Sequence, residues 1–386
     1  MTRRRTTLVA LTAVAVAVGA ACAPPPPPST PPTNPLTLGA SGVPGNGAVL
    51  SASISGDGNV VAFTSAATNL VPGDTNGVPD LFVRTVPNGS VTRIAEQVSG
   101  EPRVSTNGRF VSYRTSTGQL AVHDRTAGTT ASWTPATSGF GPVTPIVPPD
   151  GSVAISGVPS SFGIAATACR VRTLATGTEQ DCPAGGPGFG QLAFEAASPN
   201  GRHVMYSWID QSGGGTSGRF VWDRLAGTTT LVPPSVAVFP SFGVLGDDGR
   251  SIVLTQVLAS GFGSLVVYDL PTATVTTMPG PVPDGTTVAT GVSNDGSTVS
   301  FVSQATNLVP ADTNGAVDTF RWNLDTGTVV RTSVTIGGGA QLPNGANRCG
   351  TGPGQTTTDG VRTCGLTVDP AAAIDTNGTT DAYRLG

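Results

Sequence analysis

Residues 52–65 spell ASISGDGNVVAFTS, which is a turn flanked by two strand-like runs. Asp-Gly and Asn-Gly steps are strong turn signals, and Val, Phe and Thr favour β-strands. Seven such steps that lead directly into a strand-like run recur at similar intervals, beginning at Asp57, Asn107, Asp150, Asn200, Asp248, Asp295 and Asp359. The steps lie 50, 43, 50, 48, 47 and 64 residues apart, which indicates a structural repeat.

Each unit has room for four short strands. In the first unit we expect strands at Ala48–Ser55, Asn59–Ser65, Leu81–Thr85 and Ser90–Ala95. The later second strands are expected at Arg109–Thr115, Ser152–Val158, Arg202–Trp208, Arg250–Gln256 and Ser297–Ser303. Repeats of this length, each with several strands and turns, are typical of a β-propeller, in which every blade packs against neighbours on both faces.

The sequence therefore predicts an all-β fold, a β-propeller of four-stranded blades over residues 36–386, with seven blades. The seventh unit stops after its third strand, Asp381–Leu385, and a spare strand, Leu36–Ala40, precedes the first unit. We expect this N-terminal strand to complete the seventh blade and close the ring, because closure removes exposed strand edges. The alternative is six blades followed by a loose tail at 337–386, which Gly337–Gly339 and the 64-residue interval favour.

Composition fits an all-β domain and argues against nucleic-acid binding. The 386 residues include 52 Gly and 33 Pro, which suits many turns, and 38% are hydrophobic, which is too many for wholesale disorder. The formal net charge is −4, and it falls by three, to −7, when Arg3, Arg4 and Arg5 are removed. No basic cluster follows them, so the chain lacks the cationic stripe that phosphate binding requires.

Residues 1–23 have the features of a bacterial signal peptide: a positive start, a short apolar stretch at Leu8–Val18 and small residues before Cys22. The end of this stretch resembles a lipobox, in which the leader is cut before a cysteine that carries lipid, although Gly19 stands where Leu is usual. Residues 24–35 are Pro-rich and predict an extended tether. We therefore expect an extracytoplasmic protein that is lipid-anchored to the bacterial cell membrane through Cys22, with plain secretion as the alternative.

The other four cysteines fall into two local pairs. Cys169 and Cys182 flank a turn at Thr176-Gly177, and Cys349 and Cys364 flank the seventh Asp-Gly step. Cysteines that are nearly symmetric about a hairpin turn can face each other across antiparallel strands, and export permits disulfides. Zinc is the competing interpretation, but no Cys-x-x-Cys occurs and the chain has only two histidines. We expect the disulfides Cys169–Cys182 and Cys349–Cys364.

Two long phrases carry a family resemblance. Residues Ala52–Arg84 and Thr290–Trp322 both contain a DG turn, a VAF-like strand, the phrase NLVP-x-DTNG and a third strand. They resemble the WD40-like (PD40), TolB-type propeller repeats of exported bacterial proteins. The seventh unit keeps DTNGTTDAYR, whereas the middle four keep only the turn and strand skeleton. The resemblance implies a protein-interaction or cell-surface scaffold, and it supplies no shared catalytic residue.

The pattern Asp-Thr-Asn-Gly-x-x-Asp, called the DTNG loop below, is the sharpest candidate site. Its oxygen-bearing side chains are Asp74, Asn76 and Asp80 in the first unit, Asp312, Asn314 and Asp318 in the sixth, and Asp375, Asn377 and Asp381 in the seventh. Oxygens at positions 1, 3 and 7 around a glycine suit Ca²⁺, but the acidic ligand at position 12 of an EF-type loop is missing. The alternative is a structural Asx-turn whose last Asp caps backbone amides.

Catalysis has little support in the sequence. His123 and His203 lie in different units, and no Gly-x-Ser-x-Gly elbow or phosphate loop occurs. The chain has no room for the separate hydrolase domain of prolyl-peptidase-like enzymes, and two histidines cannot build the metal site that TolB-like polysaccharide lyases need. The tryptophans are Trp133, Trp208, Trp222 and Trp322. They could line a ligand surface, but the strand patterns around Trp208 and Trp222 favour packing between blades.

These patterns predict a monomeric, non-catalytic binding scaffold that presents loops at the propeller channel to a partner protein or an envelope glycan. The alternative is a hydrolase or lyase that acts on envelope carbohydrate or a lactone, with calcium from the DTNG loops near the channel. A third possibility is a purely structural surface repeat.

Overall fold

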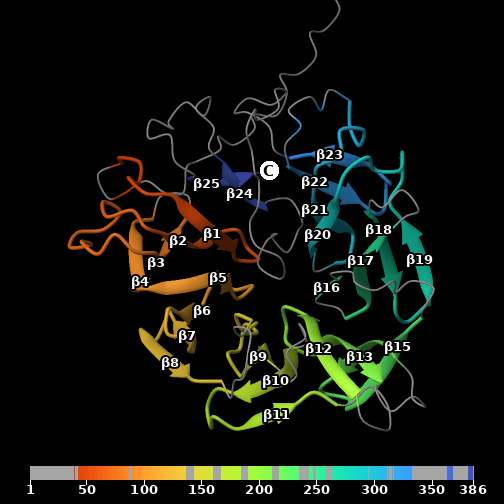
Figure 1. Ribbon diagram of the computed structural model, residues 1–386, viewed down its shortest axis with the longest axis horizontal. Helices are drawn as coiled ribbons and strands as arrows, with labels where there is room; N and C mark the ends of the chain where they lie inside the picture. Colours follow the sequence, from red (N-terminus) through yellow and green to blue (C-terminus); the bar gives the residue numbers. More distant parts are fainter. Residues whose placement is uncertain are drawn as a thin grey trace, which may run out of the picture.

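The computed structural model describes most of the propeller region. The described residues are 39, 42–86, 89–135, 143–159, 167–183, 190–210, 217–233, 243–246, 249–257, 263–293, 295–310, 312, 315, 317–332, 363–367 and 381–385. They form antiparallel sheets around a central axis, with the first strand of each blade innermost and the last at the periphery (Figure 1). The predicted all-β propeller of four-stranded antiparallel blades is confirmed.

The strands follow the chain from blade to blade. Blade 1 contains β1 (Val49–Ile54), β2 (Val60–Ser65), β3 (Asp80–Thr85) and β4 (Val91–Ala95). Blade 2 contains β5 (Val98–Val104), β6 (Phe110–Thr115), β7 (Leu120–Asp124) and β8 (Thr129–Trp133). Blade 3 contains β9 (Val153–Pro159), β10 (Thr167–Thr173) and β11 (Glu179–Asp181). Blade 4 contains β12 (Gly190–Ala197), β13 (His203–Asp210), β14 (Gly218–Asp223) and β15 (Thr228–Val232).

Two more blades and a smaller sheet complete the described structure. Blade 5 contains β16 (Gly243–Leu245), β17 (Ser251–Val257), β18 (Gly263–Asp269) and β19 (Thr274–Thr277). Blade 6 contains β20 (Thr287–Val292), β21 (Thr298–Ser303), β22 (Asp318–Asn323) and β23 (Val329–Arg331). A two-stranded sheet is made by β24 (Thr363–Thr367) and β25 (Asp381–Leu385).

Among the described residues the structure shows six blades, the alternative in our prediction, rather than seven. In place of a seventh four-stranded blade, the structure describes only the pair β24–β25, which lies between blades 1 and 6 and contacts β1 (Figure 1). The predicted closing strand Leu36–Ala40 falls outside the described residues except for Gly39, so closure is not seen.

Strand direction gives the central channel two distinct ends. The short turns that join first to second strands and third to fourth strands lie at one end, called the turn end here. The loops that join second to third strands, and the links between blades, lie at the other end, called the loop end. Because β1 runs from the loop end towards the turn at Ser55–Gly58, the chain enters blade 1 at the loop end.

The Asp-Gly turns are held by a repeated set of hydrogen bonds. The Ser55 hydroxyl donates to Asp57 Oδ1 (2.5 Å), and the same oxygen accepts the Asn59 N–H (2.9 Å). The Val60 N–H in turn donates to Ser55 Oγ (2.9 Å), and Gly58 has φ 71°, which glycine adopts without strain. Equivalent serine-to-Asx bonds occur at Ser105–Asn107, Ser198–Asn200 and Ser293–Asp295. The repeated sequence signal is therefore a repeated structural cap.

Apolar side chains fill the spaces between successive blades. Val60 and Ala62 of β2 pack with Val111 and Tyr113 of β6 in one such cluster. Similar clusters join blades 3 and 4, blades 4 and 5, and blades 5 and 6. Each fully buried side chain of this kind stabilises the fold by about 1.5–3 kcal/mol relative to exposure. Strands that are apolar on both faces thus follow from the radial packing.

Among the residues that the structure describes, no helix is long and apolar enough to span a membrane. The predicted signal peptide at 1–23 and the tether at 24–35 lie outside these residues.

Candidate functional site

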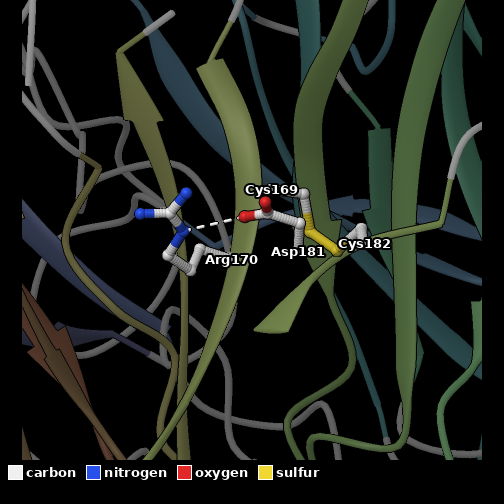
Figure 2. Close-up of a disulfide and its surroundings, with 4 residues drawn as sticks. All are labelled: Cys169, Arg170, Asp181 and Cys182. Atoms are coloured by element: carbon white, nitrogen blue, oxygen red, sulfur yellow. Dashed lines mark hydrogen bonds and ion pairs between the residues drawn. A yellow bond between two sulfur atoms is a disulfide. The ribbon is translucent and has the colours of Figure 1, made fainter. Parts of the chain in front are cut away.

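The hairpin β10–β11 of blade 3 carries one of the two predicted disulfides. Cys169 and Cys182 are bonded, with their Cα atoms 5.3 Å apart, which confirms that pair (Figure 2). On the neighbouring positions, Arg170 Nε donates to Asp181 Oδ1 (2.8 Å), so an ion pair flanks the disulfide. The covalent bond fixes the short outer strand β11 to β10. A disulfide is also consistent with an extracytoplasmic location.

The second predicted disulfide and the lipidation site cannot be placed in the same way. Cys349 and Cys22 lie outside the described residues, and Cys364 is the second residue of β24. The pair Cys349–Cys364 and the lipid on Cys22 therefore stay predictions.

In the DTNG loop of blade 1, an arginine lies between the two carboxylates. Arg93 Nη1 is 3.1 Å from Asp80 Oδ2 and 3.5 Å from Asp74 Oδ1. The carboxylate side chains are 0% and 2% exposed, respectively. Asn76 donates from Nδ2 to Asp80 (3.2 Å) and accepts the Val78 N–H at Oδ1 (3.1 Å), which is an Asx-turn contact. The positive charge beside these two carboxylates is therefore the guanidinium of Arg93.

In the DTNG loop of blade 6, an arginine also lies near the first carboxylate. Arg331 Nη1 is 3.9 Å from Asp312 Oδ1, and Asp318 is fully buried. Asn314 lies outside the described residues. Of the third loop, Asp375 and Asn377 are also outside, and Asp381 is the first residue of β25.

Within the described ranges, no three His, Cys, Asp or Glu side chains are grouped as a metal site. Calcium binding by the DTNG loops stays a prediction. Sequence reasoning did not connect the arginines with these loops, although a signal was present. Arg93 follows Asp80 by 13 residues, and Arg331 follows Asp318 by the same number.

The two histidines have separate, local partners. His123 accepts or donates a bond at Nδ1 with Thr130 Oγ1 (2.9 Å) on the next strand, and burial lowers its pKa. His203 packs beneath the turn glycine of blade 5, Gly249, and its Nε2 lies 3.6 Å from Asp223 Oδ2. The structure does not bring the two histidines together, since they belong to blades 2 and 4.

The four tryptophans are all buried, with Trp322 at 1% exposure and Trp133 at 9% the extremes. Trp208 and Trp222 pack with blade 3 residues in the cluster between blades 3 and 4. Packing between blades, the second interpretation of these side chains, is what the structure shows for this pair.

The structure adds a cleft that the sequence did not indicate. It lies at the turn end of the channel and is small, since its volume of about 280 Å³ includes the open solvent above it. Blades 2, 3 and 4 build it together, with Arg103, Val104, Ser105, Thr106, Ile146, Val147 and Pro199 as its lining. Among the described residues of blade 3, the innermost pairing is a bridge between Ile146 and Ile155.

The cleft combines one cation with hydroxyl and apolar surface. Burial lowers the pKa of the Arg103 guanidinium, and the negative charge of Glu101 opposes that shift. The guanidinium still carries its charge at neutral pH, because arginine does not deprotonate in proteins. Thr106 is half-buried, and Ile146 and Val147 supply apolar wall. Such a mixture suits the binding of a polar group with an apolar neighbour.

Comparisons with known proteins support the fold. No family profile matches the sequence, and no curated protein is similar to it. Among solved structures, an oligogalacturonate lyase from Vibrio parahaemolyticus has TM-score 0.53 at 12% identity, covering 92% of this chain and 89% of its own. The acylaminoacyl peptidase of Pyrococcus horikoshii has TM-score 0.52 at 14% identity, covering 87% of this chain and 51% of its own.

A further similar structure is TolB from Acinetobacter baumannii, with TM-score 0.42 at 15% identity, covering 75% of this chain and 65% of its own. The likenesses to the lyase and the peptidase support a propeller architecture for this chain. At such low identity these likenesses describe architecture, and architecture of this kind hosts many unrelated functions.

Proposed function

We propose that this chain is a non-catalytic binding scaffold outside the cytoplasm, and that its ligand contacts the turn end of the propeller channel. The observation that carries the proposal is the cleft built by three successive blades around Arg103. A site made from several blades is rigid, because each blade is locked to its neighbours by packed cores. A rigid site pays little ordering entropy on binding, which favours affinity without chemistry.

The segment just before β1 lies at the end of the propeller opposite to the cleft. Asn46 N–H donates to Asn69 Oδ1 (2.8 Å), and Asn69 Nδ2 donates to the Pro44 carbonyl (2.9 Å). These bonds hold the segment before β1 against the β2–β3 loop, at the loop end. The cleft lies at the opposite end of the channel.

The partner that we propose is a protein or an envelope glycan. Both offer polar groups beside apolar surface, which match the guanidinium of Arg103 and the wall formed by Ile146 and Val147. The cleft is small, so the surrounding turns supply most of the contact area.

The experiment uses the domain of residues 36–386 without lipid, in pull-downs from envelope extracts and on a glycan array. Thr106→Phe fills the cleft, and Arg103→Gln removes its charge. The matched control is Thr126→Phe, because Thr126 is an exposed residue of a turn at the same end, outside the cleft. We expect both cleft variants to weaken binding by about ten-fold or more, equivalent to about 1.4 kcal/mol, and the control to bind normally.

Two results count against this function. Ligand binding that Thr106→Phe leaves intact places the site elsewhere on the propeller. Turnover of any glycan or lactone by the purified domain instead supports the enzyme alternative. Circular dichroism and melting curves of each variant show whether a loss of binding is a loss of folding.

A further inference from the structure

The DTNG loop of blade 1 buries negative charge that needs a counter-charge. Asp80 is fully buried, and its oxygens accept bonds from Arg93 Nη1 (3.1 Å) and from the Gln97 N–H (2.9 Å). Asp74 Oδ1 is buried and makes no hydrogen bond within the described structure, so Arg93 at 3.5 Å is its compensating group. A buried carboxylate without such compensation is strongly destabilising. One guanidinium therefore serves both carboxylates.

The same strand position supplies the arginine in blade 6. Arg93 of β4 stands opposite Phe82 of β3, and Arg331 of β23 stands opposite Phe320 of β22. The loop residues Asp74 and Asp312 are separated by 238 positions, as are the two arginines. The DTNG loop and the fourth-strand arginine thus occur together twice, in one register.

We propose that Arg93 and Arg331 are built-in counter-cations of the DTNG loops in blades 1 and 6. Each guanidinium occupies the place where a bound divalent ion would otherwise neutralise the two carboxylates. It also ties the outermost strand of its blade to the loop between the second and third strands. In blades 1 and 6 the loop is then ordered by the chain itself, without calcium.

The backbone near Arg93 includes one residue in an unfavourable conformation, and that residue is hydrogen-bonded to the same loop. Gln97, in the link between blades 1 and 2, has φ 53°, a conformation that a residue with a side chain adopts at a cost. Its N–H donates to Asp80, the carboxylate that Arg93 neutralises. Glu96 adds a further contact, with Oε1 2.8 Å from Arg93 Nη2. The arginine therefore positions both the DTNG loop and the link to the next blade.

The test replaces the arginine and asks whether calcium can take over. We expect Arg93→Gln to lower the Tm by about 5–10 °C, since it leaves two buried carboxylates uncompensated. Millimolar CaCl₂ should restore part of this loss, and calorimetry should detect Ca²⁺ binding to the variant. The wild-type protein should show neither a CaCl₂-dependent Tm rise nor binding heat from these two loops. Arg109→Gln, which removes an exposed ion pair with Asp124, is the matched control.

Three results overturn the proposal. The first is a wild-type Tm that rises with CaCl₂, when the Asp74→Asn variant shows no such rise. The second is an Arg93→Gln variant as stable as Arg109→Gln, and the third is a destabilised Arg93→Gln variant that Ca²⁺ neither binds nor restores. If Arg93→Gln does not fold, Arg331→Gln gives the same test. Its pair is longer, at 3.9 Å, so a smaller loss of Tm is expected there.

Discussion

Gly108 of blade 2 packs against Val60 of blade 1 so closely that a Cβ on the glycine would lie 2.6 Å from Val60 Cγ2. The same relation recurs in later blades, where the turn glycines Gly151 and Gly249 sit over Phe110 and His203. Each of these three turn glycines therefore has two roles. It supplies a positive φ, and it lets the next blade approach.

We predict that Gly108→Ala destabilises the domain by about 2–4 kcal/mol. Roughly 1 kcal/mol comes from the backbone at φ 71°, and about 1–3 kcal/mol comes from the overlap with Val60. Gly128→Ala is the matched control, because Gly128 has φ 68° but no atom within 4 Å of its Cβ position. It should cost only about 1 kcal/mol. Urea denaturation measures both, and equal losses would contradict the packing argument.

The disulfide of blade 3 gives a second prediction. Cys169 and Cys182 are 13 positions apart and close a loop of about 14 residues, so loss of the bond should cost about 3 kcal/mol in the chain-entropy model. The double variant Cys169→Ala/Cys182→Ala should melt at a lower temperature than the wild type. An unchanged Tm shows that the bond adds no stability.

Thiol counting tests the predicted bond between Cys349 and Cys364. The domain of residues 36–386, unfolded without reductant, should contain no reactive thiol if both bonds form. Two thiols per chain, with the Cys169–Cys182 bond located by peptide mapping, would contradict the second pairing.

Stability should decline in acid through the exposed ion pairs at the turn end. Arg109 donates to Asp124 through Nε (3.0 Å) and Nη2 (2.7 Å), and these bonds lower the pKa of Asp124 to about 2. A carboxyl with a depressed pKa in the folded state stabilises the fold above its unfolded pKa of about 3.9. That contribution is lost as the pH falls from about 4 through 2.

Asp124→Asn isolates this effect. The variant should be slightly less stable than the wild type at pH 7, because the pair is exposed and screened by solvent. The difference should vanish near pH 2, where wild-type Asp124 is half-protonated or more. Guanidinium is unsuitable for this measurement because it is a salt, so urea curves at pH 7, 4.5 and 2.5 are the test. A difference that persists unchanged at pH 2.5 contradicts the assignment.

Lipidation can be tested in a bacterial host. Cys22→Ser removes the residue that carries lipid in the proposed anchor, so the protein should move from the membrane fraction to the medium or the soluble extracytoplasmic fraction. Ala21→Ser, next to the proposed cleavage point, is a control that keeps the cysteine. Equal distribution of Cys22→Ser and wild-type protein supports the secreted alternative.

The strands could be predicted from the sequence because a local turn signal precedes each of them. The predicted second strand Asn59–Ser65 is observed as Val60–Ser65, and Arg109–Thr115 is observed as Phe110–Thr115. A turn with glycine at positive φ followed by apolar residues fixes such a strand locally. The number of blades depends instead on pairing between distant segments, which no local pattern specifies.

Local motifs could not predict the cleft or the arginine contacts, because both also depend on how separate strands are brought together in the fold. Arg103 and Pro199 line one cleft although they are 96 positions apart, and only the packing of successive blades brings them together. Arg93 lies on a different strand from Asp80, so only the register of β3 and β4 brings them together.

The constant spacing between blades 1 and 6 gives the last prediction, on ring closure. The bonds that hold residues 44–47 against the β2–β3 loop are repeated 238 positions later: Asn69 Nδ2 donates to the Pro44 carbonyl, and Asn307 Nδ2 donates to the Val282 carbonyl (2.7 Å). Upstream of Val282, the fourth strand of the preceding blade, β19, spans Thr274–Thr277. Subtracting the same 238 positions from Thr274–Thr277 gives residues 36–39, which therefore correspond in sequence to a fourth strand.

Residues 36–39 should therefore supply the outer strand beside β25, as the sequence predicted. We expect a chain that begins at residue 42 to melt at a lower temperature and less cooperatively than one that begins at residue 36, because its last sheet keeps an unpaired edge. Removal of residues 1–35 alone should change neither property, since the tether precedes this frame. Substituting Thr37 with Pro within the longer chain should reproduce the loss, because proline removes a ladder hydrogen bond from a strand. If the chains that begin at residues 36 and 42 unfold alike, the N-terminal segment does not close the ring.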